Sequence, residues 1–162
     1  MEIWPILRAL ALLAAANGAP VLARKIFGGR WSWPLDFGVC FFDGRPLLGR
    51  TKTIRGIAAS MLTTALVAVF MGLDWTTGGL FGLAAMAGDL LSSFAKRRLA
   101  LPSSSQAPGL DQVPESLIPL VAFCSSLGLS IIDVVVATLL FWVGELILSR
   151  QLYRLGLRDR PY

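Results

Sequence analysis

The residue most suggestive of chemistry is an aspartate inside an apolar stretch. Residues 88–98 read GDLLSSFAKRR, so Asp89 lies about two helical turns, roughly 10 Å, before the basic cluster that begins at Lys96. Insertion scales assign a cost of about 2.5–3.5 kcal/mol to an unpaired Asp at mid-membrane. Asp89 therefore needs a partner. Two kinds fit: a cation of the same helix bundle, such as Lys96 or Arg55, or a metal ion in a polar cavity.

A second set of candidates lies in a glycine-rich, basic loop. Residues 34–56 read PLDFGVCFFDGRPLLGRTKTIRG and run into an apolar stretch that predicts a helix. Glycine amides and helix starts favour anions, so one interpretation is a phosphate cradle, although the GxxxxGK[ST] motif is absent. The other is an interfacial loop anchored by aromatic residues, with its basic side chains on anionic lipid heads. The cradle would use Gly49, Lys52, Thr53, Arg55 and Gly56.

Further acidic residues indicate a magnesium site. Asp43 lies in the same loop, and Asp111 lies in PGLDQ, after the basic cluster. If these carboxylates converge with Asp89 near the cluster, they suit Mg²⁺, which prefers oxygen ligands and shares one or two carboxylates with phosphate oxygens. A zinc or iron site is not predicted, because the chain has no histidine and only two cysteines, at unrelated positions.

The composition predicts a membrane protein. The chain has 162 residues, of which 55% are hydrophobic and only 15% charged, and its mean hydropathy is +0.66. Soluble domains carry about a quarter charged residues, and disordered chains carry far fewer apolar ones. We attribute the net charge of +5 to basic residues in cytoplasmic loops and not to a nucleic-acid-binding surface. The expected architecture is all-α, a single integral membrane domain over residues 1–162.

Five stretches approach the roughly 20 apolar residues that a spanning helix needs. In the third of them, Asp89, Ser93 and Lys96 share one helical face, which Gly78 and Gly82 extend, so a neighbouring helix can pack closely there. The five expected spans are residues 3–23, 54–73, 76–95, 115–129 and 131–149.

The basic residues predict the orientation. They gather in the segments 24–53 and 96–113 and in the tail from residue 150, whereas the turns around Asp74 and Ser130 carry none. Under the positive-inside rule this alternation places the N-terminus outside and the C-terminus in the cytoplasm. The long loops after the first and third spans are then both cytoplasmic. The candidate site would face the cytoplasm from a multi-pass protein of the cell (inner) membrane.

The motifs resemble those of a known family. The loop DFGVCFFDGRPLLGRTKTIRG, followed by GDLLSSFAKRR and PGLDQ, resembles the CDP-archaeol synthase family, and the five-span layout agrees. A more distant likeness is to CDP-diacylglycerol synthases, through KTIRG, SFAKR and PGLD, but their GHGG segment is missing. The archaeal LDQxD pattern is also altered, because LDQV is followed by Pro114 and the next acid is Glu115.

The resemblance implies a reaction and a set of site residues. CTP and a membrane lipid phosphate would give a CDP-lipid and pyrophosphate, with Mg²⁺ as cofactor. Catalytic roles fall to Asp89, Lys96 and Asp111, and the metal ligands would be Asp89, Asp111 and Asp43. The expected substrate-binding residues are Lys52, Thr53, Arg55, Gly56, Arg97, Arg98, Arg45 and Ser93.

Two other functions are weighed against this one. Asp43-Gly44-Arg45 resembles the start of the CDP-alcohol phosphotransferase motif, but no Asp follows Asp89 at four residues, as that motif requires. A small transporter, or a structural membrane subunit with intramembrane ion pairs, would need neither CTP nor metal. Transporters often show inverted repeats, and the chain has no repeat and an odd number of expected spans. In a homodimer the two copies would supply the paired halves, so the odd number of spans in one chain does not exclude a transporter.

Overall fold

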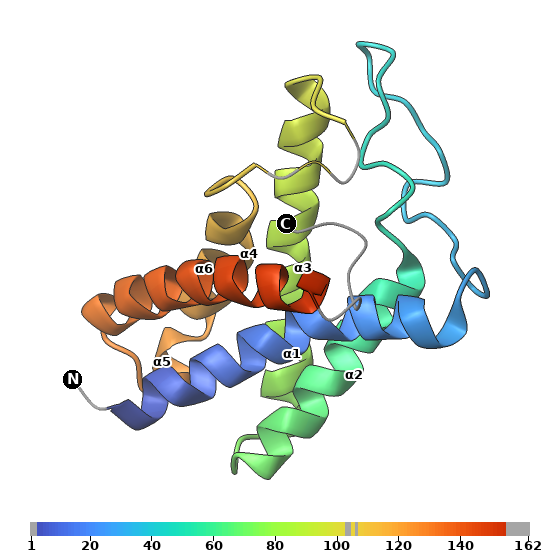
Figure 1. Ribbon diagram of the computed structural model, residues 1–162. Coiled ribbons are helices and arrows are strands. Elements are labelled where there is room, and N and C mark those ends of the chain that lie inside the picture. The colour runs from blue at the N-terminus through green and yellow to red at the C-terminus, as the bar shows by residue number, and fades with distance from the viewer. Residues whose placement is uncertain (1–2, 103–104, 106, 155–162) are drawn as a thin grey trace.

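The protein is a bundle of helices in a computed structural model that describes residues 3–102, 105 and 107–154 (Figure 1). Within these residues there is no strand, only two isolated β-bridges in the loop between the first two helices. The all-helical class is therefore confirmed. The helices are α1 (Ile3–Phe27), α2 (Ile54–Phe70), α3 (Trp75–Arg98), α4 (Gln112–Ala122), α5 (Cys124–Leu127) and α6 (Ile131–Arg154).

Three of the described helices are long and apolar enough to cross a membrane: α1, α3 and, over Ile131–Ser149, α6. Helix α2 is apolar but shorter, with 17 residues. These four elements correspond to four of the expected spans. The count of five and the orientation stay predictions.

The expected span 115–129 is not one continuous helix. Helix α4 has 11 residues and rises about 16 Å, half of a roughly 30 Å bilayer core. It ends at Phe123, whose N–H bonds back to the Pro119 carbonyl, and a four-residue helix α5 follows. Gly128 then reverses the chain with a φ of 69°, a left-handed conformation that glycine adopts without strain. The fourth expected span is thus a broken segment.

Helix α1 extends one turn beyond the expected span 3–23. The Asn17 side chain donates to the Leu13 carbonyl within the helix at 3.2 Å, and the helix continues through Pro20 to Phe27. Its last two turns therefore extend over the start of α2. A Cβ atom added at Gly56 would lie 3.5 Å from the Pro20 Cβ atom.

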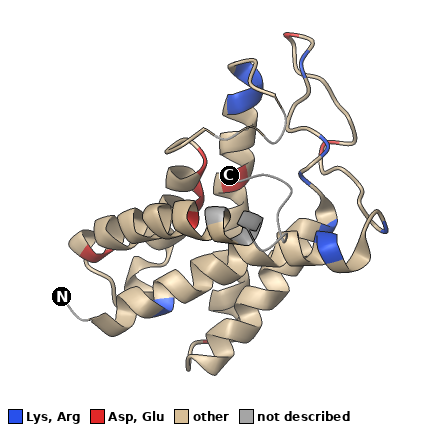
Figure 2. Ribbon diagram, in the orientation of Figure 1, with Lys and Arg blue, Asp and Glu red and all other residues tan. Residues whose placement is uncertain are grey.

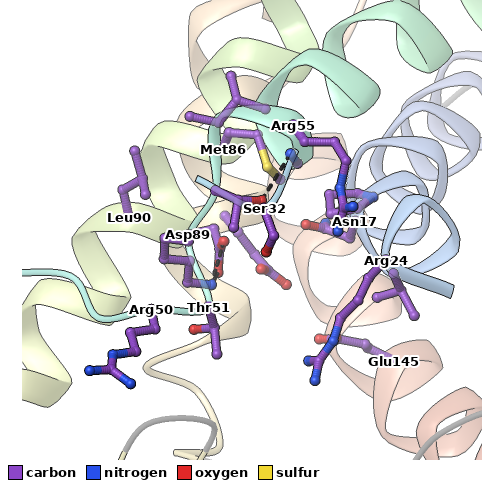
Figure 3. Close-up of a pocket in the computed structure, with 17 residues that line it drawn as sticks. Asn17, Arg24, Ser32, Arg50, Thr51, Arg55, Met86, Asp89, Leu90 and Glu145 are labelled. Atoms are coloured by element: carbon purple, nitrogen blue, oxygen red, sulfur yellow. Dashed lines mark hydrogen bonds and ion pairs between the residues drawn. The ribbon is translucent and has the colours of Figure 1, made fainter. Parts of the chain in front are cut away.

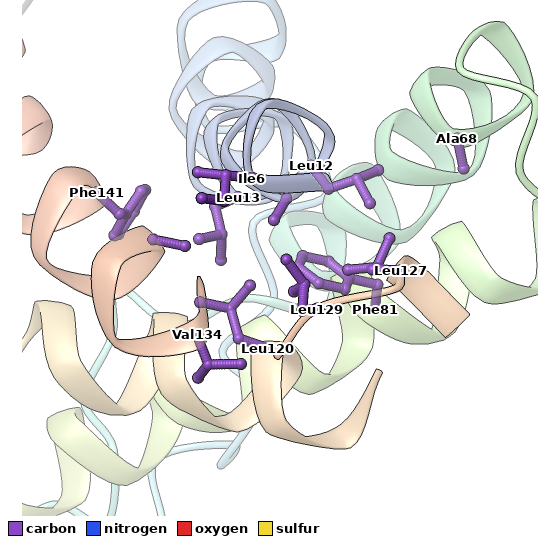
Figure 4. Packing of buried hydrophobic residues seen from close by; sticks show 12 residues of the cluster. Ile6, Leu12, Leu13, Ala68, Phe81, Leu120, Leu127, Leu129, Val134 and Phe141 are labelled. Atoms are coloured by element: carbon purple, nitrogen blue, oxygen red, sulfur yellow. The ribbon is translucent and has the colours of Figure 1, made fainter. Parts of the chain in front are cut away.

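The apolar core lies where α1, α3, α4 and α6 meet (Figure 4). Leu12, Leu13, Phe81 and Leu120 are all fully buried there. By contrast, the outer faces carry large exposed apolar side chains, such as Phe70 at 88% exposure. A surface of this kind suits hydrocarbon rather than water.

Helices α2 and α3 pack against each other through small residues, as the sequence predicts. A methyl group added at Gly82 would overlap the Thr64 hydroxyl and lie 3.1 Å from the Ser60 carbonyl oxygen. One added at Gly78 would overlap Ala68 and lie 2.9 Å from the Ala65 Cα atom. Without side chains at these two positions, the backbones approach closely, which fixes α3 relative to α2.

The loop between α1 and α2 folds around one carboxylate. Asp36, only 7% exposed, accepts hydrogen bonds from the N–H groups of Gly38 at 3.1 Å and of Leu48 and Gly49 at 2.9 Å. Burial raises the pKa of Asp36, but these three backbone donors outweigh it and hold the pKa below its ordinary value of 3.8. Asp36 therefore ties together the two ends of the segment 36–49.

We expect Gly82→Ala to destabilise the bundle, because the methyl group has no room against α2. The free energy of unfolding should fall by about 1–3 kcal/mol, the range for overpacked cores. Thermal unfolding of the purified protein in detergent measures it. The matched control is Gly144→Ala on α6, where an added Cβ meets nothing within 4 Å. If both variants unfold like the wild type, the close packing of α2 on α3 is wrong.

The loop should open in acid. Because folding lowers the pKa of Asp36, its contribution to loop stability is present above pH 3.8 and is lost as pH falls through the lower pKa of the folded state. Asp36→Asn should remove that contribution at every pH. Hydrogen exchange of the Leu48 and Gly49 amides should be faster in the variant at neutral pH, and the difference should shrink in acid. A difference that stays constant with pH would contradict this assignment.

Candidate functional site

A polar cavity of about 460 Å³ lies among α1, α2, α3, α4 and α6, beneath the loop between α1 and α2 (Figure 3). Its wall contains four cationic and three anionic side chains in an otherwise apolar bundle. The polar lining residues are Asn17, Arg24, Ser32, Arg50, Thr51, Lys52, Thr53, Arg55, Asp89, Glu115 and Glu145.

An ion pair between Lys52 and Asp89 forms one side of the cavity (Figure 3). The Lys52 ammonium lies 2.6 Å from both carboxylate oxygens of Asp89, and each side chain is 22% exposed. Sequence reasoning expected a cation partner at Lys96 or Arg55; the structure provides Lys52 instead. The reason lies in the loop: Lys52 accepts the Leu35 N–H and donates to Gly49, so its backbone is fixed beside α3.

The start of α2 forms a second side. Thr53 caps the helix by accepting the Gly56 N–H at 3.2 Å, and Gly56 is small enough to lie against Pro20 of α1. The Arg55 guanidinium donates to the carbonyls of Gly28 and Arg30, which holds the end of α1 over the cavity. The structure thus brings four expected substrate-binding residues to one cavity: Lys52, Thr53, Arg55 and Gly56.

The glycine amides expected to cradle phosphate are already hydrogen bonded. The Gly49 N–H binds the Asp36 carboxylate, and the Gly56 N–H binds the Thr53 hydroxyl. The expected cradle of backbone amides is therefore not what this loop presents. Any anion in the cavity would be held by side chains.

The basic cluster at the end of α3 does not line the cavity. Figure 2 shows it at the far end of α3, close to the loops. Lys96 pairs with Asp111 at 2.6 Å, and Arg97 donates to the Pro102 carbonyl at 3.0 Å. These side chains anchor the segment after α3. The predicted binding residues Ser93, Lys96 and Arg97 are instead largely buried, at 3%, 8% and 8% exposure.

Arg98 and Arg45 fasten the other loop to the same end of α3. Arg98 pairs with Asp43, donates to the Pro46 carbonyl at 2.7 Å and stacks over Phe41 and Phe94. Arg45 in turn donates to the Arg98 carbonyl at 2.7 Å. The two long loops therefore meet at one end of the bundle, as the sequence predicts. Arg45 and Arg98 lie outside the cavity lining.

The three candidate metal ligands do not converge. Asp89 pairs with Lys52, Asp111 with Lys96 and Asp43 with Arg98. Among the described residues, no group of three or more Asp, Glu, Cys or His side chains is placed to hold a metal ion. Of the three, only Asp89 lines the cavity. In this structure the three carboxylates stay apart because each pairs with its own cation: Asp89 with Lys52 of the first loop, and Asp111 and Asp43 with Lys96 and Arg98 of α3.

Several lining residues were missed by sequence reasoning. Arg24 and Arg50 looked like ordinary loop charge, and nothing in their spacing separates them from their neighbours. Glu115 did carry a signal, because it is the first acid after the altered LDQ segment. Glu145 comes from α6, and Figure 3 draws it on the opposite side of the cavity from Asp89. The sequence marks Glu115 and Glu145 as acids near the expected site, and the packing of α4 and α6 brings both into the cavity lining.

The lining predicts which ligands the cavity can hold. The lysine and arginine side chains of its lining suit a polyanion, and the carboxylates of the same lining suit a cation bound beside it. Histidine is absent from the whole chain, so acid–base chemistry by imidazole is excluded. The arrangement fits phosphate chemistry that works by positioning and charge stabilisation.

Comparison with known proteins places the chain in a family. A family model described as "CarS-like: CDP-archaeol synthase" matches residues 3–74 and 73–162. A CDP-archaeol synthase from Thermofilum pendens is 34% identical over 153 residues, which cover 91% of this chain and 75% of that protein. One from Sulfurisphaera tokodaii is 32% identical over 166 aligned positions, which cover 99% of this chain and 96% of that protein.

A solved structure supports the same assignment. It is described as "Structural insight into an intramembrane enzyme for archaeal membrane lipids biosynthesis" and superposes with a TM-score of 0.67. The two chains are 32% identical, and the match covers 85% of this chain and 90% of that one. Because the family model and the relatives match nearly the whole sequence, the chain belongs to the CDP-archaeol synthase family.

Proposed function

We propose that this protein is a membrane-embedded cytidylyltransferase that uses CTP to convert an archaeal-type ether-lipid phosphate into a CDP-lipid. The observation that carries the proposal is the polar cavity around the Lys52–Asp89 pair, in a chain of the CDP-archaeol synthase family. A structural subunit would also contain an intramembrane ion pair such as Lys52–Asp89, so the family assignment, and not that contact alone, favours the enzyme.

The reaction needs little from the protein beyond positioning. A phosphate oxygen of the lipid attacks the α-phosphorus of CTP, the bond between the α-phosphorus and the bridging oxygen breaks, and pyrophosphate leaves. A lipid phosphate is already anionic near neutral pH, so no side chain has to act as a strong base. Lys52 and Arg55 at the cavity wall bind the triphosphate, and Arg24 and Arg50 add to the positive field.

The remaining basic residues act on the nucleotide only indirectly, by positioning other segments of the chain. Arg45 and Arg98 fasten the loop that presents Lys52 to the end of α3. Lys96 and Arg97 bind Asp111 and the Pro102 carbonyl in the segment after α3. Ser93 is buried on α3, between Asp89 and this cluster. We therefore assign these residues to positioning rather than to direct contact with the nucleotide.

The cavity fits a magnesium ion. Its lining offers carboxylate oxygens but neither histidine nor cysteine, and the Glu115 Oε1 atom is buried without a hydrogen-bond partner. Asp89 is the expected ligand that lines the cavity, whereas Asp43 and Asp111 are held by Arg98 and Lys96. When bound, Mg²⁺ would neutralise charge on the attacking and leaving oxygens.

The lipid reaches the cavity from the bilayer. The outer faces of α1 and α6 expose large apolar side chains, among them Leu22 at 60% and Ile147 at 54% exposure. With the N-terminus outside and the C-terminus in the cytoplasm, the two loops and the cavity mouth face the cytoplasm, where CTP is made. In this arrangement the helical segments α1, α2, α3 and α6 cross the membrane, and α4 with α5 forms the fifth, broken segment.

Incubation with labelled CTP, Mg²⁺ and a panel of ether-lipid and ester-lipid phosphates tests the function. We expect labelled CDP-lipid and pyrophosphate, with the ether lipid preferred. Asp89→Asn should lower the rate by about a hundredfold, because it removes a charge that the reaction centre needs. Thermal unfolding of the same samples separates loss of chemistry from loss of folding.

The matched control is Asp74→Asn, at the opposite end of α3, where Asp74 caps the helix. Asparagine caps helices as well as aspartate does, so this variant should keep wild-type activity. If the wild type forms no CDP-lipid from any lipid phosphate, or if Asp89→Asn retains full activity, the proposed function or the assigned site is wrong.

The orientation can be tested with a native cysteine. Cys40 is exposed in the loop between α1 and α2, and replacing Cys124 by serine leaves it as the only thiol. A membrane-impermeant maleimide should label Cys40 in inside-out vesicles and not in intact cells. The Cys40→Ser variant controls for background. Labelling from the outside of intact cells would contradict a cytoplasmic cavity.

A further inference from the structure

The end of α1 and the start of the loop that follows it carry exposed aromatic side chains that the proposed reaction does not use. Phe27, Trp31 and Trp33 lie close together in the chain, and the two tryptophans are 61% and 64% exposed. None of the three lines the cavity. The ring centroids of Phe27 and Trp31 are 5.8 Å apart, so these two rings form one patch. An exposed apolar patch marks an interaction surface.

This patch lies at the level of the membrane surface. Helix α1 has 25 residues and is about 37 Å long, whereas a bilayer core is roughly 30 Å thick, so its last turn, with Phe27, can reach the headgroups. The loop then returns to the start of α2 beside α1 (Figure 1), where the Ile54 N–H donates to the Trp33 carbonyl at 3.1 Å. A spanning helix begins at the membrane surface, so Trp33 lies there too.

Cationic side chains flank the aromatic patch. Lys25 lies in the last turn of α1, Arg30 directly precedes Trp31, and both are exposed. Neither side chain has an acidic partner in the described part of the chain, and neither lines the cavity. They differ in this from Arg98, which pairs with Asp43.

The acids of the loop do not cancel this positive charge. Asp36 is buried and accepts hydrogen bonds from backbone N–H groups, and Asp43 is held by Arg98 at the end of α3. The surface around Trp31 is therefore both aromatic and positive. Tryptophan rings are enriched where hydrocarbon meets headgroups, and lysine and arginine side chains there are attracted to anionic lipids.

The backbone at Trp31 indicates that its ring has a role. Its φ is 52°, in the left-handed region that bulky residues rarely adopt and that glycine adopts without strain. A residue that served only the turn would be better as glycine. The position therefore keeps a tryptophan for its side chain, although that side chain packs into neither the core nor the cavity.

We propose that this aromatic and basic surface, here called the rim, binds the headgroups of anionic lipids in the surrounding bilayer. The rim consists of Lys25, Phe27, Arg30, Trp31 and Trp33. The lipid at the rim is a bound neighbour outside the cavity and not the substrate. The proposal requires that the protein is embedded in a membrane, but it does not depend on the proposed reaction.

The rim is connected to the cavity by hydrogen bonds. The Arg55 guanidinium, which lines the cavity, donates to the Gly28 carbonyl at 3.0 Å and also to the Arg30 carbonyl. Two residues beyond Trp33, the Leu35 N–H donates to the Lys52 carbonyl at 2.8 Å. Lipid bound at the rim should therefore hold the backbone on both sides of the cavity mouth and slow the opening of these hydrogen bonds.

Hydrogen exchange of the full chain in nanodiscs tests the proposal without turnover. One set of nanodiscs contains phosphatidylcholine alone, and the other contains an equal mixture with phosphatidylglycerol, an anionic phosphodiester that is not a lipid phosphate substrate. The amides of Leu35 and Ile54 report on the loop, because they bond to the carbonyls of Lys52 and Trp33. In the wild type their exchange should be severalfold slower in the mixture, and high salt should reduce the difference by screening the charges.

Two variants remove different parts of the rim. Lys25→Gln combined with Arg30→Gln should exchange like the wild type in phosphatidylcholine and lose the slowing by phosphatidylglycerol. Trp31→Gly removes the ring and leaves a residue suited to a φ of 52°, so it should fold and lose most of the slowing. The matched control is Trp75→Ala at the start of α3, where the tryptophan is 65% exposed; this variant should keep the full effect.

Quenching of tryptophan fluorescence by brominated lipids measures the contact itself. Brominated phosphatidylglycerol should quench the wild type more than phosphatidylcholine brominated at the same carbons, and the Lys25→Gln, Arg30→Gln chain should lose this preference. Equal quenching by the two lipids in the wild type would overturn the proposal.

The exchange data provide further contradicting outcomes. Equal exchange of the wild type in both kinds of nanodisc, or full slowing in the Lys25→Gln, Arg30→Gln chain, would show that the rim does not bind anionic lipid. Slowing that follows the number of copies in a nanodisc and not the charge of the lipid would assign the rim to a second copy of the chain instead. A protein that forms no CDP-lipid would overturn the proposed function and leave the lipid contact standing.

Discussion

The ion pair between Lys52 and Asp89 is the interaction on which the architecture of the cavity depends. An aspartate on an apolar helix is stable only beside a compensating cation. Lys52 can supply that cation because the chain leaves α1, folds a loop of some 26 residues and returns to start α2 next to α3. The loop is therefore part of the site and not merely a connection between two helices.

The loop between α1 and α2 is held by contacts within it, at its beginning and at its outer end. Asp36 gathers backbone amides inside it, Arg55 holds its beginning, and the Arg98–Asp43 pair fastens its outer end to α3. The basic cluster of α3, which the sequence predicts to bind phosphate, contacts the two loops in this structure. In the fold these basic side chains bind carbonyls and carboxylates, whereas a different set of polar side chains lines the cavity.

Much of the fold follows from patterns that the sequence displays. Length of apolar stretches predicts α1, α2, α3 and α6, because hydrocarbon requires backbone groups to bond within a helix. Gly78 and Gly82 predict close packing of a neighbouring helix, because glycine has no side chain to keep the two backbones apart. The split between α4 and α5 could not be predicted in the same way, since the break falls at Phe123 and is stabilised by bonds to carbonyls rather than by a residue type.

The sequence by itself determined the class of protein, the family and the common end of the two loops, and it singled out Asp89 and Lys52 as candidate site residues. These depend on composition, on motif and on the energetic cost of a charge in an apolar helix, which are local properties. Only the tertiary structure decided which cation meets which carboxylate. It paired Asp89 with Lys52, drew Asp43 and Asp111 away and brought Glu115 to the cavity where α4 packs on Gly88 of α3, because such pairings depend on distances between segments that the order of residues does not encode.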